Sequence, residues 1–381
     1  MNSELYLFVI WETSLHKKDI ILEDIQKKFI IRNIYEIKWS KQNFRNNLKR
    51  FYGSSLPNAK QKMDLCGTGP FLLILISDPN PQVEKKLLDD VNEVNVNLNV
   101  YNSKMMYRKW IGIDFALHSS ISKKETDHDL MLLLGKKTED LENELTQKWD
   151  GSIKKIESDL IGNNGWKDMK QFLDVLNATL NYVILRNFEE LPDKIIHHDI
   201  DILTDDVKTM SYIINEDESS SGKASVKIGN QKTFLDFRYQ VGHHYDENWS
   251  KDILKRRVFY KNAFYIPCKK DHFYTLLSHT IMQKHIRDDY KKMLSRLAMD
   301  LEMNQSINPI LNDLTKTKKF FNEYLKKMRY PKPTIYREIL YKIKHTEFMR
   351  LVKVSIFLLK TYGIKFLLIK VREKIKIVFN Y

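Results

Sequence analysis

Cysteine is scarce in this chain, with two residues among 381. Cys66 and Cys268 lie far apart in the sequence, so they form neither a disulfide framework nor the paired spacing of a zinc site. Their small number fits a reducing compartment, and we expect two ordinary buried thiols. The hydrophobic content of 43% is enough to build two or three domains with real cores without a covalent framework.

Long apolar runs are also missing. No stretch reaches the roughly 18 uncharged residues that a membrane span requires. Residues 1–18 contain a short apolar run, but neither a basic region nor a small-residue cleavage site accompanies it. This pattern predicts a first strand rather than a signal peptide. We therefore expect a cytoplasmic protein.

Positive charge is in excess, and most of it lies at one end. The net charge of +14 favours an anionic partner, which can be nucleic acid, a phosphorylated substrate or an anionic membrane surface. Residues 331–381 contain 12 Lys or Arg against 3 Glu, so they carry +9 of this charge. Their lysines alternate with aliphatic residues rather than aromatic ones, which argues against nucleic acid. We expect a basic amphipathic helical tail that lies on the inner face of a membrane or packs on the preceding domain.

The expected elements divide the chain into an α+β protein of several parts. Up to residue 77 the apolar pattern predicts strands and helices in the order β-α-β-α-β, which indicates a ferredoxin-like α/β sandwich over residues 1–137. Charge patterning predicts a helical connector over residues 138–165, which ends in the turn signal Gly-Asn-Asn-Gly. A mixed-sheet domain with a helical end is expected over residues 166–330, before the basic tail of residues 331–381.

A histidine stands out near the end of the first domain. The order of elements, the sequence GPFLLILI and the later sequence HSSISKKETDHDLMLLLG resemble nucleoside diphosphate kinases. The resemblance implies that His118, with Glu125 and Asp129 on the following helix, is a phosphorylated nucleophile, and neutral imidazole is available near pH 7 for that role. The alternative is a scaffold domain in which His118 is a hydrogen-bonded polar residue.

Two carboxylates lie two residues apart in the sequence HDIDIL of residues 198–203. Strand alternation points Asp199 and Asp201 to one face, while Ile200 and Ile202 point to the other. Because buried carboxylates are costly without a positive partner, the pair predicts a site for a divalent cation. The alternative is that the two acids cap a helix or pair with lysines.

A third acid, Asp236, lies on an alternating strand expected at residues 232–239. An Asp-x-Asp strand followed by a strand with one acid resembles the nucleotidyltransferase superfamily, and residues 241–285 resemble the fukutin-like and LicD-like branch of it. The resemblance covers residues 182–290. It implies that Asp199, Asp201 and Asp236 are catalytic and bind Mg²⁺ or Mn²⁺, because oxygen ligands suit these hard cations. The alternative for Asp236 is a salt bridge with Arg238 or Arg257.

The Gly-Ser pair of the superfamily is missing before the first acids. Arg186 and Asn187 stand in its place, and an arginine can bind phosphate through two parallel hydrogen bonds. The nucleotide-binding residues that we expect are Arg186, Asn187, His198, Arg238 and Lys284, and the expected substrate-binding residues are His243, His244 and Tyr245. The alternatives are a simply hydrogen-bonded His198 and a solvent-exposed Lys284 whose stem covers apolar surface.

Together these features predict a metal-dependent transferase. The resemblance implies a nucleotide-activated donor of the CDP-linked type and a glycan or lipid-linked acceptor, to which a phospho-alditol or sugar phosphate is moved. Nucleotidyl transfer onto a sugar phosphate or a protein is the alternative reaction. A non-catalytic basic adaptor at an anionic membrane is the alternative from another class of protein.

Overall fold

We describe the fold from a computed structural model. It covers residues 4–56, 58–89, 92–113, 115–145, 147–196, 199–216, 223–238, 245–303 and 307–331. The basic tail predicted for residues 331–381 therefore lies outside the described residues, apart from Pro331. The described chain is mixed α/β, consistent with the α+β class predicted from the sequence.

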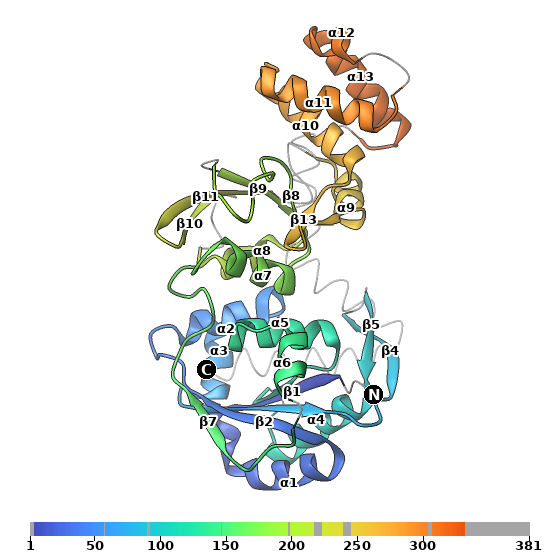
Figure 1. The fold of residues 1–381 in the computed structure, drawn as a ribbon. Coiled ribbons are helices and arrows are strands. Elements are labelled where there is room, and N and C mark those ends of the chain that lie inside the picture. The colour runs from blue at the N-terminus through green and yellow to red at the C-terminus, as the bar shows by residue number, and fades with distance from the viewer. Residues whose placement is uncertain are drawn as a thin grey trace, which may run out of the picture.

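A five-stranded sheet forms the first part of the molecule (Figure 1). Its strands lie in the order β6 (Leu117–Ser119), β1 (Leu5–Ile10), β3 (Phe71–Ser77), β2 (Ile30–Ile37) and β7 (Ile153–Ile156). Neighbouring strands are antiparallel except β2 and β7, which are parallel. All residues of β1 and β3 are buried, because helices cover both faces of the sheet; such strands read as continuous apolar runs.

Helices pack on each face of this sheet. One face carries α1 (Lys18–Lys28) and α4 (Leu98–Ile111), whose apolar side chains meet Tyr6, Phe8 and Ile10. The opposite face carries α2 (Phe44–Tyr52), α3 (Ala59–Cys66) and α5 (Lys123–Leu134). Two smaller elements complete this part. The hairpin of β4 (Val83–Asp89) with β5 (Asn92–Asn97) lies at its edge in Figure 1, and the helix α6 (Thr138–Glu144) packs against α5.

A second, four-stranded sheet lies beyond the second of these helical layers. Its order is β10 (Lys223–Ile228), β11 (Gln231–Arg238), β9 (Asp199–Thr204) and β8 (Tyr182–Ile184), with β9 and β11 parallel. Helices α7 (Met169–Thr179) and α8 (Val207–Ile213) cover its inner face and pack against α5 and α2 (Figure 1). One continuous apolar core thus runs from the first sheet to the second.

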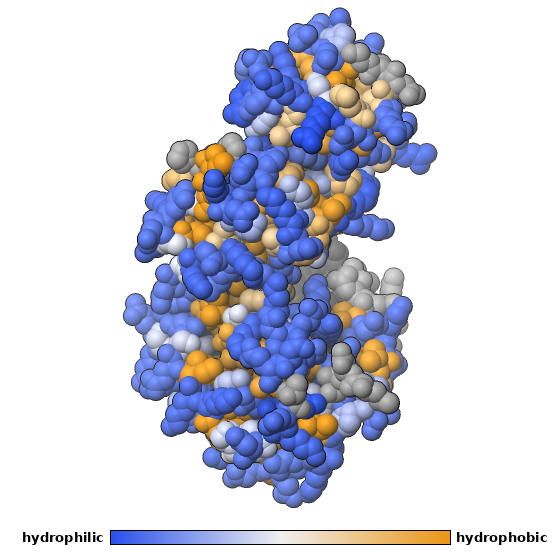
Figure 2. Space-filling view, in the orientation of Figure 1, coloured by the Kyte–Doolittle hydropathy of each residue, from blue (hydrophilic) through white to orange (hydrophobic). Residues whose placement is uncertain are grey.

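A helical region packs at one end of the outer face of the second sheet. It contains α9 (Glu247–Lys255), α10 (Lys269–Gln283), α11 (Asp288–Asp300), α12 (Asn308–Leu311) and α13 (Leu314–Lys327). Its core includes Val183, Leu185 and Leu203 from the sheet. The hairpin of β12 (Val258–Tyr260) and β13 (Phe264–Ile266) lies beside β8. In the orientation of Figure 2 the surface is mostly hydrophilic, and its apolar side chains form separate patches.

Within the described ranges, no helix has both the length and the apolar character needed to cross a bilayer.

Several sequence predictions match these elements and others do not. Strand β3 ends at Ser77, the residue up to which the β-α-β-α-β order was predicted, and Asp206 caps α8 by accepting a hydrogen bond from the Thr209 amide. The helical connector predicted for residues 138–165 is wrong in part, because β7 extends the first sheet there. Its sequence Ile-Lys-Lys-Ile places the two isoleucines three residues apart, which is a helical spacing, so the local pattern does not indicate this strand.

Candidate functional site

The three acids predicted from the sequence lie on the outer face of the second sheet. Asp201 and Asp236 are direct register partners on the parallel strands β9 and β11, and Asp199 lies two residues before Asp201. Ile200 and Ile202 are buried in the core on the inner face. Because alternate residues of a strand point to opposite faces, Asp199 and Asp201 share the outer face, as predicted.

The environments of the three acids differ. Asp201 is 1% exposed, Asp236 is half-buried and Asp199 is exposed. The guanidinium Nη2 of Arg186, itself 6% exposed, donates a hydrogen bond of 2.5 Å to Asp201 Oδ1. A buried carboxylate is costly unless it is paired, and Arg186 supplies positive charge here.

Arg186 reaches Asp201 because of how β8 ends. The amide of Leu185 donates to the Asp201 carbonyl oxygen, so the antiparallel β8–β9 ladder continues to the residue before Arg186. The chain then turns at Asn187, whose φ of 59° is left-handed. Glycine and asparagine tolerate this conformation best. The turn is thus built by asparagine at the place where the resemblance expects a Gly-Ser pair.

The three acids have the ligand atoms that Mg²⁺ or Mn²⁺ prefers, but the positions of their side chains do not form a complete site for either ion. Carboxylate oxygens from neighbouring strands are the donors that these cations prefer. Among the described residues, however, no group of three or more His, Cys, Asp or Glu side chains is close enough to bind one ion. The hydrogen bond from Arg186 gives a physical reason, because it occupies an oxygen of the most buried acid. Metal binding by Asp199, Asp201 and Asp236 therefore stays a prediction.

The other residues predicted near this site differ in their surroundings. Tyr245 is 3% exposed and packs edge-on against Trp249 in the helical core, with ring centroids 4.9 Å apart. Lys284 ends α10 in a left-handed conformation and is exposed. Arg238 lies on β11 opposite Leu203, and only its backbone is described. His198, His243 and His244 lie outside the described residues.

One cation that the sequence predictions missed lies near the acids. Arg287, which precedes α11, donates to both carboxylate oxygens of Asp289 and lies over the ring of Tyr290. Its pKa is raised chiefly by the hydrogen bond that it donates to Asp289, and the charge of Asp199 adds to the shift. The segment between α10 and α11 therefore approaches the exposed end of the acid pair.

His118 lies in the first part of the molecule, on the edge strand β6. It is 7% exposed, and its Nε2 is 2.7 Å from Asp129 Oδ2. The other oxygen of Asp129 is 3.0 Å from His128 Nδ1. Burial alone would raise the pKa of Asp129, but the two histidines outweigh burial and hold that pKa below its usual range.

A cavity of about 330 Å³ opens beside His118. Lys62 on α3 and the pair Lys104 and Arg108 on α4 line it, together with His118 and Glu125. Sequence reasoning missed these three cations, because α3 and α4 are far apart along the chain and each lysine alone looks like an ordinary surface residue. In the folded chain, the three cations nevertheless line the same cavity.

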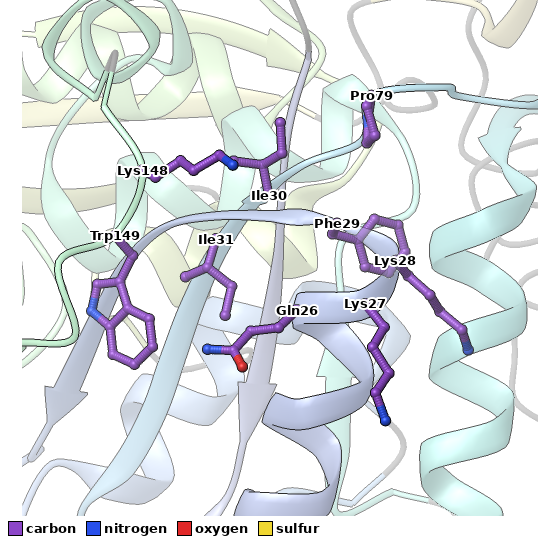
Figure 3. A pocket seen from close by; sticks show the side chains of 9 residues that line it. All are labelled: Gln26, Lys27, Lys28, Phe29, Ile30, Ile31, Pro79, Lys148 and Trp149. Atoms are coloured by element: carbon purple, nitrogen blue, oxygen red, sulfur yellow. The ribbon is translucent and has the colours of Figure 1, made fainter.

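Another pocket, of about 360 Å³, lies at the C-terminal end of α1 (Figure 3). Lys27, Lys28 and Lys148 are the charged residues that line it. Lys27 pairs with Glu23 and Lys28 with Asp24 along the same helix, at 2.6 and 2.8 Å. No histidine or carboxylate is among its described lining residues.

Comparison with protein-family models, with curated proteins and with solved structures found no match for this chain. The chemistry of the two sites is therefore argued from their residues.

Proposed function

We propose that this chain is a metal-dependent transferase of nucleotidyltransferase fold, whose centre is the group Asp199, Asp201 and Asp236. It would move a phospho-alditol or sugar phosphate from a nucleotide-activated donor to a glycan or lipid-linked acceptor of the cell surface. The observation that carries the proposal is the register of Asp201 with Asp236 on parallel strands, beside Asp199 on the same face.

The strand orders add support for the proposed architecture. Strand β9, which carries two of the acids, is antiparallel to β8 and parallel to β11, which carries the third acid. This pairing agrees with the mixed sheet expected for the second domain. In the first sheet, the order β6-β1-β3-β2 with antiparallel neighbours agrees with a ferredoxin-like sandwich.

The residues of the site can be given separate tasks. Asp201 and Asp236 would hold the divalent cation, which when bound offsets negative charge on the donor phosphates. Arg186, when it is not bonded to Asp201, presents a planar guanidinium suited to two phosphate oxygens. Asp199 is the exposed acid, so it is best placed to accept the proton of an acceptor hydroxyl. The basic tail would keep the enzyme near a lipid-linked acceptor at the inner face of the membrane.

Donor turnover with Mg²⁺ tests the assignment directly. Asp201→Asn should lower turnover by at least about 100-fold if the carboxylate is part of the catalytic centre. Asp193→Asn is a matched control, because Asp193 is an exposed acid in the loop between β8 and β9. Unchanged turnover in Asp201→Asn would show that the site is wrongly assigned.

Product analysis then identifies the reaction. Release of a nucleoside monophosphate from a diphosphate donor would indicate phosphotransfer, whereas release of pyrophosphate from a triphosphate would indicate nucleotidyl transfer. Binding to anionic vesicles together with no binding of nucleotide or metal would favour the membrane adaptor instead.

A further inference from the structure

We propose that the cavity beside His118 is a binding site for a small phosphorylated ligand, which it holds without transferring the phosphate. We further propose that occupancy of this cavity is transmitted to the strand that carries Asp201. Only the enzymatic meaning of the second step rests on the proposed function; the binding site and its structural coupling do not.

The charge of the cavity is the first argument. Lys104 and Arg108 lie one turn apart on α4, so their charges stand on one face of the helix, where like charges repel. Lys62, 8% exposed, joins them from α3 and lies over the ring of Tyr52. Glu125 is the one acid among the described side chains that line the cavity. The lining therefore carries an excess of positive charge, which favours an anion.

Neutral carbonyl oxygens hold the two lysines of the cavity. Lys62 donates to the Phe115 carbonyl oxygen at 2.5 Å and Lys104 to that of Ser119 at 3.0 Å, while Arg108 donates to that of Leu117 through two nitrogens at 3.0 Å. Because carbonyl oxygens carry no net charge, the bonds of Lys62 and Lys104 orient the two ammonium groups without cancelling their charge. Burial lowers the pKa of Lys62 to about 8, and it also lowers that of Lys104. A bound phosphate would offset this unfavourable burial of charge.

The size and walls of the cavity define the ligand class. About 330 Å³ is at the lower end of the range for small-molecule sites. Leu56, Phe115 and the ring of Tyr52 supply apolar wall beside the cations. A phosphate ester with a small organic group fits both features.

His118 is held as a wall of this cavity rather than as an attacking group. Its Nε2 is bonded to Asp129, and its ring packs against Phe51 and Tyr52 with centroids 5.2 and 5.6 Å away. With 7% of its surface exposed, the imidazole has little freedom to approach and leave a phosphorus atom. Binding without transfer is the consequence.

A short chain of bonds joins the cavity to the second sheet. Tyr52, Ser55 and Leu56 line the cavity, and Ser54 lies among them in the 3-10 helix Gly53–Ser55. The Ser54 amide donates to Thr209 Oγ1 at 2.8 Å, and its hydroxyl donates to Asp206 Oδ2 at 2.6 Å. Asp206 caps α8 directly after β9, the strand of Asp201.

Residues 52–56 and the first turn of α8 lie close enough for a displacement of one to shift the other. Gly53 has a φ of 55°, and a Cβ added there would lie 2.6 Å from Thr209 Oγ1. A ligand that shifts residues 52–56 therefore also shifts the cap of α8, because no space separates them. Packed contacts of this kind move together rather than deform independently.

The binding step is tested on the full chain by calorimetry with pyrophosphate and CMP as probes, in EDTA so that metal-dependent binding at the acids is absent. Lys104→Ala and Arg108→Ala should each weaken binding by about tenfold or more, the effect of one lost charged hydrogen bond. Lys109→Ala is the matched control, because Lys109 is exposed on the same helix. Equal affinities in all four proteins, or no binding to wild type, would overturn the site.

The coupling step is tested by hydrogen–deuterium exchange over residues 199–213. Saturating CMP should slow exchange there in wild type and leave it unchanged in Ser54→Ala, which keeps its affinity for CMP. The same slowing in both proteins, or none in either, would overturn the coupling, whether or not the acids are catalytic. Acid-labile phosphate on His118 after incubation with a nucleoside triphosphate and Mg²⁺ would overturn binding without transfer.

Discussion

Arg186 and Asp201 form a buried ion pair at the centre of the proposed acid site, with 2.5 Å between Nη2 and Oδ1. The arginine takes the position of a counter-cation for the carboxylate. If a divalent ion binds here as proposed, it competes with Arg186 for the same oxygen, and the balance between them can be measured.

Replacement of Arg186 by Gln should destabilise the protein. Removing one partner of a buried ion pair costs about 3–5 kcal/mol, because the other charge is left poorly compensated. Thermal unfolding with and without Mg²⁺ measures the effect, and Mg²⁺ should restore more stability to Arg186→Gln than to wild type. Arg296→Gln, on the exposed surface of α11, controls for loss of charge. Equal unfolding temperatures of Arg186→Gln and wild type would contradict a stabilising pair.

Loss of stability in mild acid is expected from His272. Burial lowers the pKa of His272 from 6.5 to about 4, and its Nε2 has no hydrogen-bond partner among the residues that the structure describes. The unfolded chain therefore binds more protons between pH 6.5 and 4, so stability present above pH 6.5 is lost as the pH falls through this window. The loss attributable to this residue is roughly 3 kcal/mol.

His272→Phe tests this expectation, because it keeps a ring against Phe188, whose centroid is 4.9 Å away. Urea unfolding at several pH values should show a shallower fall in the free energy of unfolding for His272→Phe than for wild type. His16→Phe, in the exposed segment before α1, should retain the wild-type slope. Parallel curves for His272→Phe and wild type would argue against a neutral buried imidazole.

The affinity of the cavity for CMP should depend on pH through Lys62. Because burial lowers the pKa of Lys62 to about 8, its charge is present below pH 8 and is lost above it. Calorimetry between pH 7 and 9.5 should show weaker binding as the pH rises. Lys62→Arg should bind with less dependence on pH, since arginine stays charged throughout this range. A pH profile that Lys62→Arg leaves unaltered would exclude Lys62 from the site.

The cap of α8 should contribute more stability than an ordinary cap. Asp206 accepts hydrogen bonds from the Thr209 amide, the Thr209 hydroxyl and the Ser54 hydroxyl. Asp168, which caps α7, accepts one from the Gln171 amide. Loss of an ordinary cap costs about 1 kcal/mol. Because Asp206 accepts more hydrogen bonds, Asp206→Ala should lower the free energy of unfolding more than Asp168→Ala does. Denaturant unfolding of both variants gives the comparison, and equal costs would show that the Ser54 bond adds no stability.

Local patterns allowed the acid strand and its neighbours to be predicted. Alternating acids and isoleucines predicted β9. Strand β10 was not predicted, although Ala224, Val226 and Ile228 alternate in the same way and are buried. That alternation is the signal that would have identified it.

Long-range partners were beyond the reach of such patterns. The pairing of Arg186 with Asp201 depends on the antiparallel register of β8 and β9, which sequence spacing does not specify. The cations of the His118 cavity depend on where α3 and α4 pack on the first sheet. Chemistry carried by one strand can thus be read locally, whereas a cavity between elements requires the fold.

The core shared by the two sheets limits how this protein can be divided. Apolar side chains from α2 and α5 pack in the same cluster as those from α7 and β9. A fragment ending near residue 137 would expose that layer to water and would tend to aggregate rather than persist as an autonomous unit. In hybrid proteins, the sandwich and the acid-bearing sheet would consequently have to be exchanged together.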